Sequence, residues 1–265
     1  MKRLAVLGHP VSHSRSPAMH NAALAELGLG GEWSYEAIDV RPDEFEARVR
    51  SMAGGDCVGA NLTIPHKEAA LALADELSET AREIGAVNTL SFVDGSVRAD
   101  NTDAAGFLAS LEGQVGGKRA LILGAGGAAR AVVWALLREG AELSVWNRTE
   151  LRSRNLCDDL GGTPVAAPDI RDYELIVNTT SVGLGGEDPF AELPLETDRF
   201  GPGQTVVDMV YGEEPTLLLA AAEAAGARTV DGIEILVRQG ARSFELWTGL
   251  EAPLETMRAA ARLAI

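Results

Sequence analysis

The sequence contains few cysteines, and none is placed to bind a metal or to form a redox pair. Cys57 and Cys157 are the only two among 265 residues, and they lack partners at the spacing of a zinc site or a redox motif. This excludes a disulfide framework and predicts two buried free thiols. The four histidines form no recognised pattern of ligands either, so we expect no metal site.

Long apolar runs are absent as well. No stretch approaches the about 20 apolar residues that a membrane span requires, and residues 1–10 lack the apolar core of a signal peptide. We therefore expect a globular, cytoplasmic protein.

Basic residues are scarce, with 23 Lys and Arg against 39 Asp and Glu and a formal charge of −16. Because nucleic acids and acidic membranes are bound mainly through Lys and Arg, neither is an expected partner.

Short apolar runs alternate with helical periods along the chain, which is typical of an α/β fold. Hydrophobic residues make up 46% of the sequence, which is ample for packed cores. In the first part of the chain the pattern predicts a mostly parallel sheet, with strands at 4–8, 33–39 and 58–63 and helices at 17–27, 42–52 and 66–77. Strands at 87–92 and 97–99 flank Asp94-Gly95, a hairpin signal that adds an antiparallel edge.

A second sheet is predicted to begin at Arg119. Its expected strands are 119–123, 142–146, 174–178, 205–208 and 228–230. With no strands left to pair, the amphipathic helices expected at 233–246 and 253–263 should fold back on the first domain. The predicted domains are residues 1–103, 104–232 and 233–265.

The stretch from Ala120 to Arg130 is typical of a buried strand that breaks into a glycine turn and opens a helix. Gly124 allows a tight turn, Gly126 lets the backbone approach a pyrophosphate, and Ala129 is the small residue where the helix packs on the strand. The free N–H groups of the first helical turn then face the diphosphate. The pattern predicts a Rossmann domain, although an ordinary strand-to-helix turn also accommodates these residues.

The residues after the second strand of this domain indicate which dinucleotide is bound. An NAD site usually carries an Asp or Glu there for the ribose 2′-hydroxyl, whereas an NADP site places Arg near the 2′-phosphate. The sequence has Asn147, Arg148 and Thr149 at this point, with Arg152 one helical turn further on. We therefore predict NADP, the alternative being that both arginines are solvated charges at a helix start.

Polar residues follow several strands of the first domain, where the ligands of α/β proteins bind. They include hydroxyls, amides, one ammonium and carboxylates: Ser14, Ser16, Asn61, Thr63, Lys67, Asn88, Thr89, Asp100, Asn101, Thr102 and Asp103. Taken singly, several of them also suit helix caps or first-turn positions. Together they suggest a site for a small polyhydroxylated acid in a cleft between the domains.

These motifs resemble those of the shikimate dehydrogenases, NADP-dependent enzymes of aromatic amino acid biosynthesis. The resemblance covers nearly the whole chain. It lies in residues 14–17, 61–67, 85–89, 100–103, 124–127, 147–149, 178–183, 208–211 and Gln239. It implies two α/β domains and the reversible reduction of 3-dehydroshikimate to shikimate by NADPH.

The resemblance also implies roles for individual residues on the substrate side. Lys67 and Asp103 form the catalytic pair. The residues expected to bind the substrate are Ser14 and Ser16 for its carboxylate, Thr63, Asn88, Asp103 and Gln239 for its ring hydroxyls, and Tyr211 as part of the pocket wall. A homodimer is an open option.

On the cofactor side the resemblance divides the expected contacts into three groups. The pyrophosphate is held by Gly124, Ala125, Gly126, Gly127 and Ala128. The 2′-phosphoadenosine is held by Asn147, Arg148, Thr149 and Arg152. The nicotinamide side is formed by Thr179, Val210 and Gly232.

Hydride delivery to a ketone explains why such a site needs an ammonium group. Negative charge grows on the ketone oxygen as the hydride arrives, and an alkoxide is too basic to form unaided near neutral pH. Lys67 can stabilise that oxygen and protonate it, while Asp103 orients the ammonium and binds the adjacent hydroxyl. Which of the two carries the transferred proton stays open, because such a pair can titrate as a unit.

Three other interpretations remain open. A quinate or quinate/shikimate dehydrogenase shares the framework, but tends to carry Thr at the position of Ser16 or an acidic residue near Asn147. A methylene-tetrahydrofolate dehydrogenase also uses a lysine, but leaves the Ser14–Ser16 and Asn101–Asp103 motifs without a purpose. A regulatory module that binds NADP without catalysis is the non-enzymatic alternative.

Overall fold

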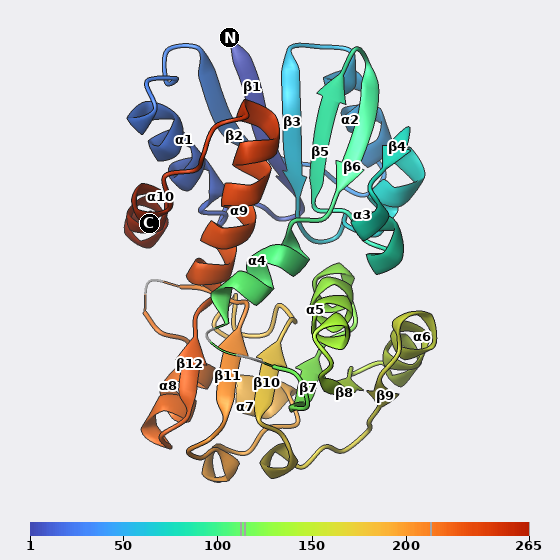
Figure 1. Cartoon of the computed structure of the whole chain (residues 1–265), viewed down its shortest axis with the longest axis vertical. Helices are drawn as coiled ribbons and strands as arrows, with labels where there is room; N and C mark the ends of the chain where they lie inside the picture. Colours follow the sequence, from blue (N-terminus) through green and yellow to red (C-terminus); the bar gives the residue numbers. More distant parts are fainter. Residues whose placement is uncertain (112, 114, 213, 265) are drawn as a thin grey trace. The chain divides into compact units, whose positions relative to one another are not determined.

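The computed structural model describes residues 1–111, 113, 115–212 and 214–264. The chain divides into two units, Met1–Gly106 with Leu236–Ile265, and Phe107–Ile235 (Figure 1). Each unit contains a six-stranded sheet flanked by helices, which confirms the predicted α/β class.

The sheet of the first unit has the strand order β2-β1-β3-β5-β6-β4. Its strands are β1 (Lys2–Gly8), β2 (Trp33–Asp39), β3 (Cys57–Leu62), β4 (Glu76–Leu77), β5 (Thr89–Val93) and β6 (Ser96–Asp100). β1 is parallel to β2 and β3, whereas β5 is antiparallel to both β3 and β6. The predicted hairpin about Asp94-Gly95 is therefore confirmed, and its first strand places Thr89 opposite Asn61.

Helices cover both faces of this sheet. On one face, α2 (Phe45–Ala53) and the short η1 (Ala69–Leu73) and α3 (Glu79–Ile84) bury their apolar residues in one core cluster. On the other face, α1 (Ser16–Glu26) places His20 against Tyr35 of β2, with a ring separation of 4.2 Å. The helices predicted at 17–27 and 42–52 are confirmed by α1 and α2 to within a few residues.

The helix predicted at 66–77 is wrong. The structure has the 3-10 helix η1 in the middle of this range and the strand β4 at its end. The chain leaves the helical path at Asp75, whose backbone N–H donates to the Val97 carbonyl and whose carboxylate accepts from the Val97 N–H. Pairing with β6 therefore prevails over helix propensity at this edge of the sheet.

The last two helices, α9 (Gly232–Thr248) and α10 (Leu254–Leu263), return to the first unit as predicted. The indole N–H of Trp247 in α9 donates to the Leu90 carbonyl at 2.9 Å, so the helix packs on β5. α10 packs along α1. This return brings Gln239 of α9 to Asn88, which directly precedes β5.

The second unit is a fully parallel sheet with the order β12-β11-β10-β7-β8-β9. Its strands are β7 (Arg119–Leu123), β8 (Glu142–Trp146), β9 (Thr163–Pro164), β10 (Leu175–Asn178), β11 (Thr205–Asp208) and β12 (Arg228–Val230). Its helices include α5 (Gly127–Arg138), α6 (Glu150–Leu160), α7 (Pro189–Glu192) and α8 (Leu217–Ala224), while α4 (Asp103–Ser110) begins in the first unit. The five predicted strands are present, and the two-residue β9 is additional.

This strand order is that of a doubly wound dinucleotide-binding sheet. Counted along the chain, the order from β9 to β12 is 3-2-1-4-5-6, and it reverses between β7 and β10. Ligands of such sheets bind at the carboxyl ends of the strands at this reversal. The glycine turn after β7 and Thr179 after β10 lie at that point.

No helix within the described ranges is long and apolar enough to cross a membrane. Cys57 and Cys157 are buried and unpaired with each other, as expected.

Candidate active site

The ammonium of Lys67 and the carboxylate of Asp103 form a mostly buried ion pair in the first unit. Lys67 Nζ donates to Asp103 Oδ2 at 2.5 Å, and the two side chains are 14% and 5% exposed. Asp103 is the first residue of α4, and Lys67 lies in the loop after β3. The structure therefore brings together the two residues that the sequence predicted as a catalytic pair.

His66 fixes the loop that carries Lys67. Its ring stacks on Phe45 at 4.1 Å, and its Nε2 donates to the Val40 carbonyl at 2.8 Å. Since a carbonyl only accepts, this nitrogen carries the proton. Burial lowers the pKa of His66, so the ring is a neutral anchor.

Asn88 connects this pair to its surroundings. Its Oδ1 accepts from the backbone N–H of Thr102 at 2.7 Å, which fixes the amide orientation because that N–H can only donate. The amide NH₂ therefore faces Asp103 Oδ1 at 2.9 Å and Gln239 Oε1 at 3.1 Å. Gln239 is fixed in turn by donation from its own NH₂ to the Leu236 carbonyl. Asn88 and Gln239 are thus held beside Asp103.

The predicted serines lie at the start of α1. Ser16 is its first residue and is buried, and its N–H donates to Ser14 Oγ at 3.3 Å. Between them, the buried guanidinium of Arg15 donates to the Ala261 carbonyl of α10. Thr63 lies directly after β3, and its N–H donates to the Leu7 carbonyl. These serines and Thr63 therefore belong to the same unit as the ion pair, at the carboxyl ends of neighbouring strands.

The glycine turn of the second unit has the geometry that a diphosphate site needs. Gly124 has a φ of +111°, and a Cβ there would lie 2.6 Å from Thr179 Oγ1. Gly126 is the N-cap of α5, and a Cβ there would meet no heavy atom within 4 Å. The backbone at Gly126 is open to a ligand, at the end of a helix whose first N–H groups attract anions. Ala125, Gly127 and Ala128 complete the turn and the first helical residues.

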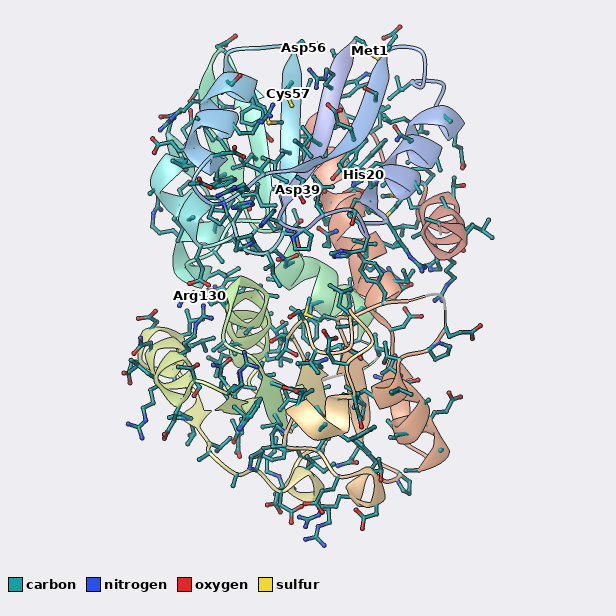
Figure 2. All side chains as sticks on the ribbon, turned by 180° about the vertical axis from the view of Figure 1, so that it is seen from behind. Met1, His20, Asp39, Asp56, Cys57 and Arg130 are labelled. Atoms are coloured by element: carbon teal, nitrogen blue, oxygen red, sulfur yellow. The ribbon has the colours of Figure 1, made fainter. Side chains whose placement is uncertain are left out.

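The residues predicted to hold a 2′-phosphate follow β8 and begin α6. The Asn147 side chain donates to the Thr149 carbonyl at 2.9 Å, and the Arg152 N–H donates to that same carbonyl, so the backbone here is ordered. The Arg148 side chain is 84% exposed and lies 3.8 Å from Glu192. Such an exposed and distant ion pair contributes little, which leaves the guanidinium available to an anion. Arg130 of α5, labelled in Figure 2, is instead paired with Asp159 of α6 at 2.9 Å.

The residues predicted for the nicotinamide side are arranged by Asp208, to which the sequence gave no role. Its Oδ1 accepts from the Val210 N–H and from Asn178, and its Oδ2 accepts from Thr216. Burial raises the pKa of this carboxyl, against the effect of the three hydrogen bonds. Asp208 thereby holds the segment that leads to Val210 and Tyr211.

Thr179 lies beside the glycine turn, and Gly232 lies beside the segment that leads to Val210. Thr179 Oγ1 donates to the Leu123 carbonyl at 2.7 Å. A Cβ at Gly232 would lie 2.6 Å from the Met209 carbonyl oxygen and 2.7 Å from that of Val210. The Gly232 backbone therefore packs directly against the Met209–Val210 backbone. The described structure thus gathers Thr179, Val210, Tyr211 and Gly232 in the second unit.

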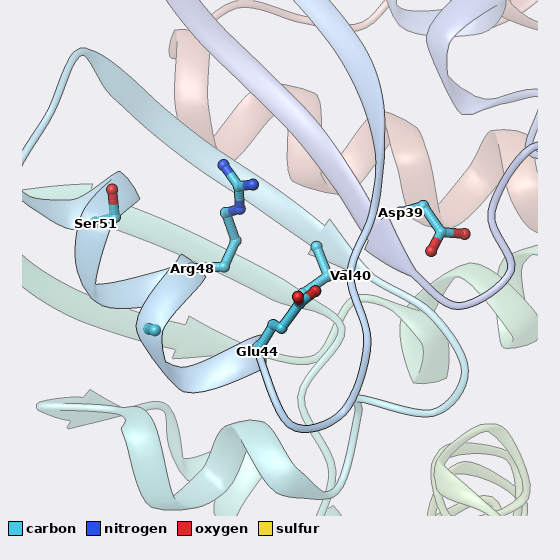
Figure 3. A pocket seen from close by; sticks show the side chains of 6 residues that line it. Asp39, Val40, Glu44, Arg48 and Ser51 are labelled. Carbon is cyan, nitrogen blue, oxygen red and sulfur yellow. The ribbon is translucent and has the colours of Figure 1, made fainter.

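A surface pocket beside α2 is lined by none of the predicted site residues. It is lined by Asp39, Val40, Glu44, Ala47, Arg48 and Ser51. In Figure 3 the side chains of Arg48 and Ser51 project from α2, while Asp39 lies on the other side of the intervening chain. Asp39 is paired with His9 at 2.7 Å. This pocket contains neither the ammonium–carboxylate pair nor the glycine turn.

The two sites together define a class of protein. A doubly wound sheet with an open glycine turn at its reversal is a dinucleotide-binding fold, and a buried ammonium suited to stabilise and protonate an oxyanion is what a carbonyl-reducing enzyme supplies in addition to its cofactor. The chain is a dinucleotide-dependent oxidoreductase.

Comparison with known proteins identifies the family. Residues 6–90 match the shikimate dehydrogenase substrate binding domain, residues 108–183 match the shikimate / quinate 5-dehydrogenase family, and residues 232–262 match the shikimate 5′-dehydrogenase C-terminal domain. The chain therefore belongs to the shikimate dehydrogenase family, and the resemblance noted in the sequence is confirmed.

Individual relatives match over nearly their full length. The shikimate dehydrogenase (NADP⁺) of Methanopyrus kandleri is 46% identical, over 96% of this chain and 93% of its own. The crystal structure of the Thermus thermophilus enzyme in complex with NADP(H) and shikimate has a TM-score of 0.91 and 45% identity, covering 100% of both chains. That of the Aquifex aeolicus shikimate dehydrogenase has a TM-score of 0.92 and 38% identity, covering 99% of this chain and 98% of its own.

Proposed function

We propose that the protein catalyses the reversible, NADPH-dependent reduction of 3-dehydroshikimate to shikimate. The observation that carries the proposal is the mostly buried Lys67–Asp103 pair, held beside Asn88 and Gln239. The prediction of an NADP-dependent shikimate dehydrogenase agrees with the relatives, which carry that name and of which one binds both NADP(H) and shikimate. Its step in aromatic amino acid biosynthesis follows from this activity.

NADP fits the residues of the second unit. The open backbone at Gly126 and the start of α5 suit the pyrophosphate, with Gly124, Ala125, Gly127 and Ala128 forming the turn. The exposed guanidinium of Arg148 suits the 2′-phosphate, together with Asn147, Thr149 and Arg152. Thr179, Val210 and Gly232 form the nicotinamide side. When bound, the reduced cofactor supplies the hydride.

The chain's own groups supply binding and the proton. Lys67 Nζ stabilises the oxygen on which negative charge develops and gives it a proton, and Asp103 orients the ammonium. Asn88, Thr63, Gln239 and Asp103 bind the ring hydroxyls. Ser14 and Ser16 bind the carboxylate, and Tyr211 lines the pocket.

The domain roles follow from these assignments. Residues 1–103 bind substrate and carry catalysis, residues 104–232 bind NADP, and residues 233–265 pack on the substrate domain and contribute Gln239. We further propose a cytoplasmic location without nucleic-acid or membrane partners, supported by the formal charge of −16. A homodimer is the proposed assembly, and its mass in solution, measured by light scattering, tests that proposal.

A crossed assay tests the function. Nicotinamide absorbance is followed with shikimate or quinate as the substrate and NADP⁺ or NAD⁺ as the cofactor. The highest kcat/KM is expected for shikimate with NADP⁺. Equal or faster turnover of quinate would identify a quinate/shikimate dehydrogenase instead, and no turnover in any combination would identify a binding module.

A further inference from the structure

A column of buried hydrogen bonds leads from the sheet interior to the Asp103 carboxylate. It begins at Tyr35 of β2, passes through Asn61 of β3 and Thr89 of β5, and reaches Asn88, which contacts Asp103. All five residues are at most 5% exposed. Buried polar groups are costly unless they are satisfied, so a column of this length in a sheet core calls for an explanation beyond packing.

Backbone groups fix the orientation of both amides in the column. Asn61 Nδ2 lies 3.3 Å from the Asn88 carbonyl, which can only accept, so Asn61 Oδ1 must face Tyr35 and accept from its hydroxyl at 2.8 Å. Asn61 Nδ2 then also donates to Thr89 Oγ1 at 3.2 Å. The reverse amide orientation would place two acceptor oxygens against each other.

The second half of the column has the same direction. Since Thr89 Oγ1 accepts from Asn61, its proton is available for Asn88 Oδ1 at 3.0 Å, which lies closer than Thr102 Oγ1 at 3.2 Å. The Thr102 N–H independently fixes that oxygen as the acceptor, so Asn88 Nδ2 donates to Asp103 Oδ1. Hydrogen bonds that point in one direction polarise one another, and this column directs its positive ends toward Asp103.

We propose that Tyr35, Asn61 and Thr89 are positioning residues for the proposed reaction. They act through Asn88, by holding its amide in one orientation and by strengthening its donation to Asp103, which in turn orients the Lys67 ammonium. The inference rests on the proposed function and adds three residues to which that function assigns no role.

Thr89 gives the sharpest test because two substitutions separate its hydroxyl from its shape. Thr89→Val keeps the volume and removes the hydroxyl, whereas Thr89→Ser keeps the hydroxyl. In steady-state kinetics we expect Thr89→Val to lower kcat roughly tenfold and to leave the KM for NADP⁺ unchanged, since small misplacements of a catalytic group are costly. Thr89→Ser is expected to stay within about threefold of the original kcat, because the column remains intact.

Tyr35→Phe tests the end of the column that is farthest from Asp103. It also provides a second test of the proposal if Thr89→Val does not fold. It removes one hydroxyl that touches Asn61, and we expect a fall in kcat of about threefold, smaller than that of Thr89→Val. Ser243→Ala is the matched control. Ser243 Oγ lies 3.4 Å from the same Asn61 oxygen, but it has the closer Gly240 carbonyl, at 3.0 Å, for its proton, so its kcat should not change.

The outcomes are distinct. A normal kcat in both Thr89→Val and Tyr35→Phe overturns the proposal, as do equal losses in Thr89→Val and Thr89→Ser or in Tyr35→Phe and Ser243→Ala. Thermal unfolding of each variant is measured in parallel, and a loss of kcat seen only near the melting temperature also overturns it. If the original protein turns over no shikimate with NADP⁺, the proposed function itself fails and this inference fails with it.

Discussion

In the first unit the polar groups of the site are buried side chains that bind one another, such as Asn88 and Asp103, which are 1% and 4% exposed. In the second unit the corresponding groups are a backbone turn at Gly126 and an Arg148 side chain that is 84% exposed. The difference follows from the two tasks. A proton must be placed on one atom, which requires side chains held in fixed positions, whereas a phosphate is bound by any set of oriented N–H groups and cations.

The largest expected effect is that of Lys67→Met, which removes the ammonium from the buried ion pair of the first unit. We expect kcat to fall by ~10²–10⁴, the usual contribution of a positioned acid, while the KM for shikimate changes only a few fold. Steady-state kinetics with shikimate and NADP⁺ measure both. Lys118→Met, which removes a lysine of the second unit, is the control. Unchanged turnover in Lys67→Met contradicts the assignment of the proton donor.

Two glycine substitutions separate the fold from the cofactor contact in the second unit. Gly124→Ala forces a Cβ to within 2.6 Å of Thr179 Oγ1 at a φ of +111°, so we expect a lower melting temperature together with weaker NADP⁺ binding. Gly126→Ala meets no protein atom, so the melting temperature should stay the same while the Kd for NADP⁺ rises roughly tenfold through contact with the ligand. Calorimetry and fluorescence titration measure the two quantities.

The two glycine variants also contain their own check. If Gly126→Ala binds NADP⁺ normally, the open backbone there is not the pyrophosphate contact. The KM for shikimate, whose proposed ligands lie mainly in the first unit, should change little in either variant.

His20 tests whether the buried interior of the first unit is sensitive to acid. Its ring is enclosed beside Tyr35, and neither ring nitrogen has a partner within the described structure. Burial lowers the pKa of His20 from 6.5 to about 3. The folded state therefore favours the neutral ring, so the stabilisation is complete above pH 6.5 and is lost as the pH falls toward 3.

Between pH 6.5 and pH 5, this ring should remove about 2 kcal/mol from the free energy of unfolding. In His20→Leu the corresponding part of the pH dependence should vanish, as measured by urea denaturation at both pH values. His13→Leu, at an exposed position, should keep the original slope. An equal slope in His20→Leu and the original protein would show that another group is responsible.

The remaining prediction concerns the exposed cation of the second unit. Arg148→Leu should raise the KM for NADPH and narrow the preference for NADPH over NADH by about tenfold, because one charge-assisted contact to the 2′-phosphate is lost. Arg154→Leu, which removes an exposed arginine paired with Glu150 on the same helix, is the control. Unchanged discrimination between the cofactors would argue against the phosphate contact.

The same difference between the units explains which parts of the fold and of the candidate site could be predicted from the sequence. The glycine turn and the arginine after β8 are local patterns, so the cofactor domain and its five main strands could be predicted from spacing alone. The column is not local. In the sheet, β1 lies between β2 and β3, and the Tyr35 hydroxyl reaches across β1 to contact Asn61. No spacing along the chain indicates this contact.

The errors have a similar origin. The helix expected at 66–77 was replaced by η1 and β4 because Asp75 pairs with Val97, a residue that lies beyond the next helix. The two-residue strands β4 and β9 are too short to produce an alternating pattern. Asp208 belonged to a recognised motif, but only the structure shows that its carboxylate holds the Val210 segment.

The β5–β6 hairpin gives the molecule a tolerant attachment point. Its register pairs Thr89 with Asp100 at the end beside Asn88 and Thr102, and Val93 with Ser96 at the opposite end, beside the Asp94-Gly95 turn. A fluorophore, an epitope or a longer loop grafted at that turn is therefore expected to leave Asn88 and Thr102 in place.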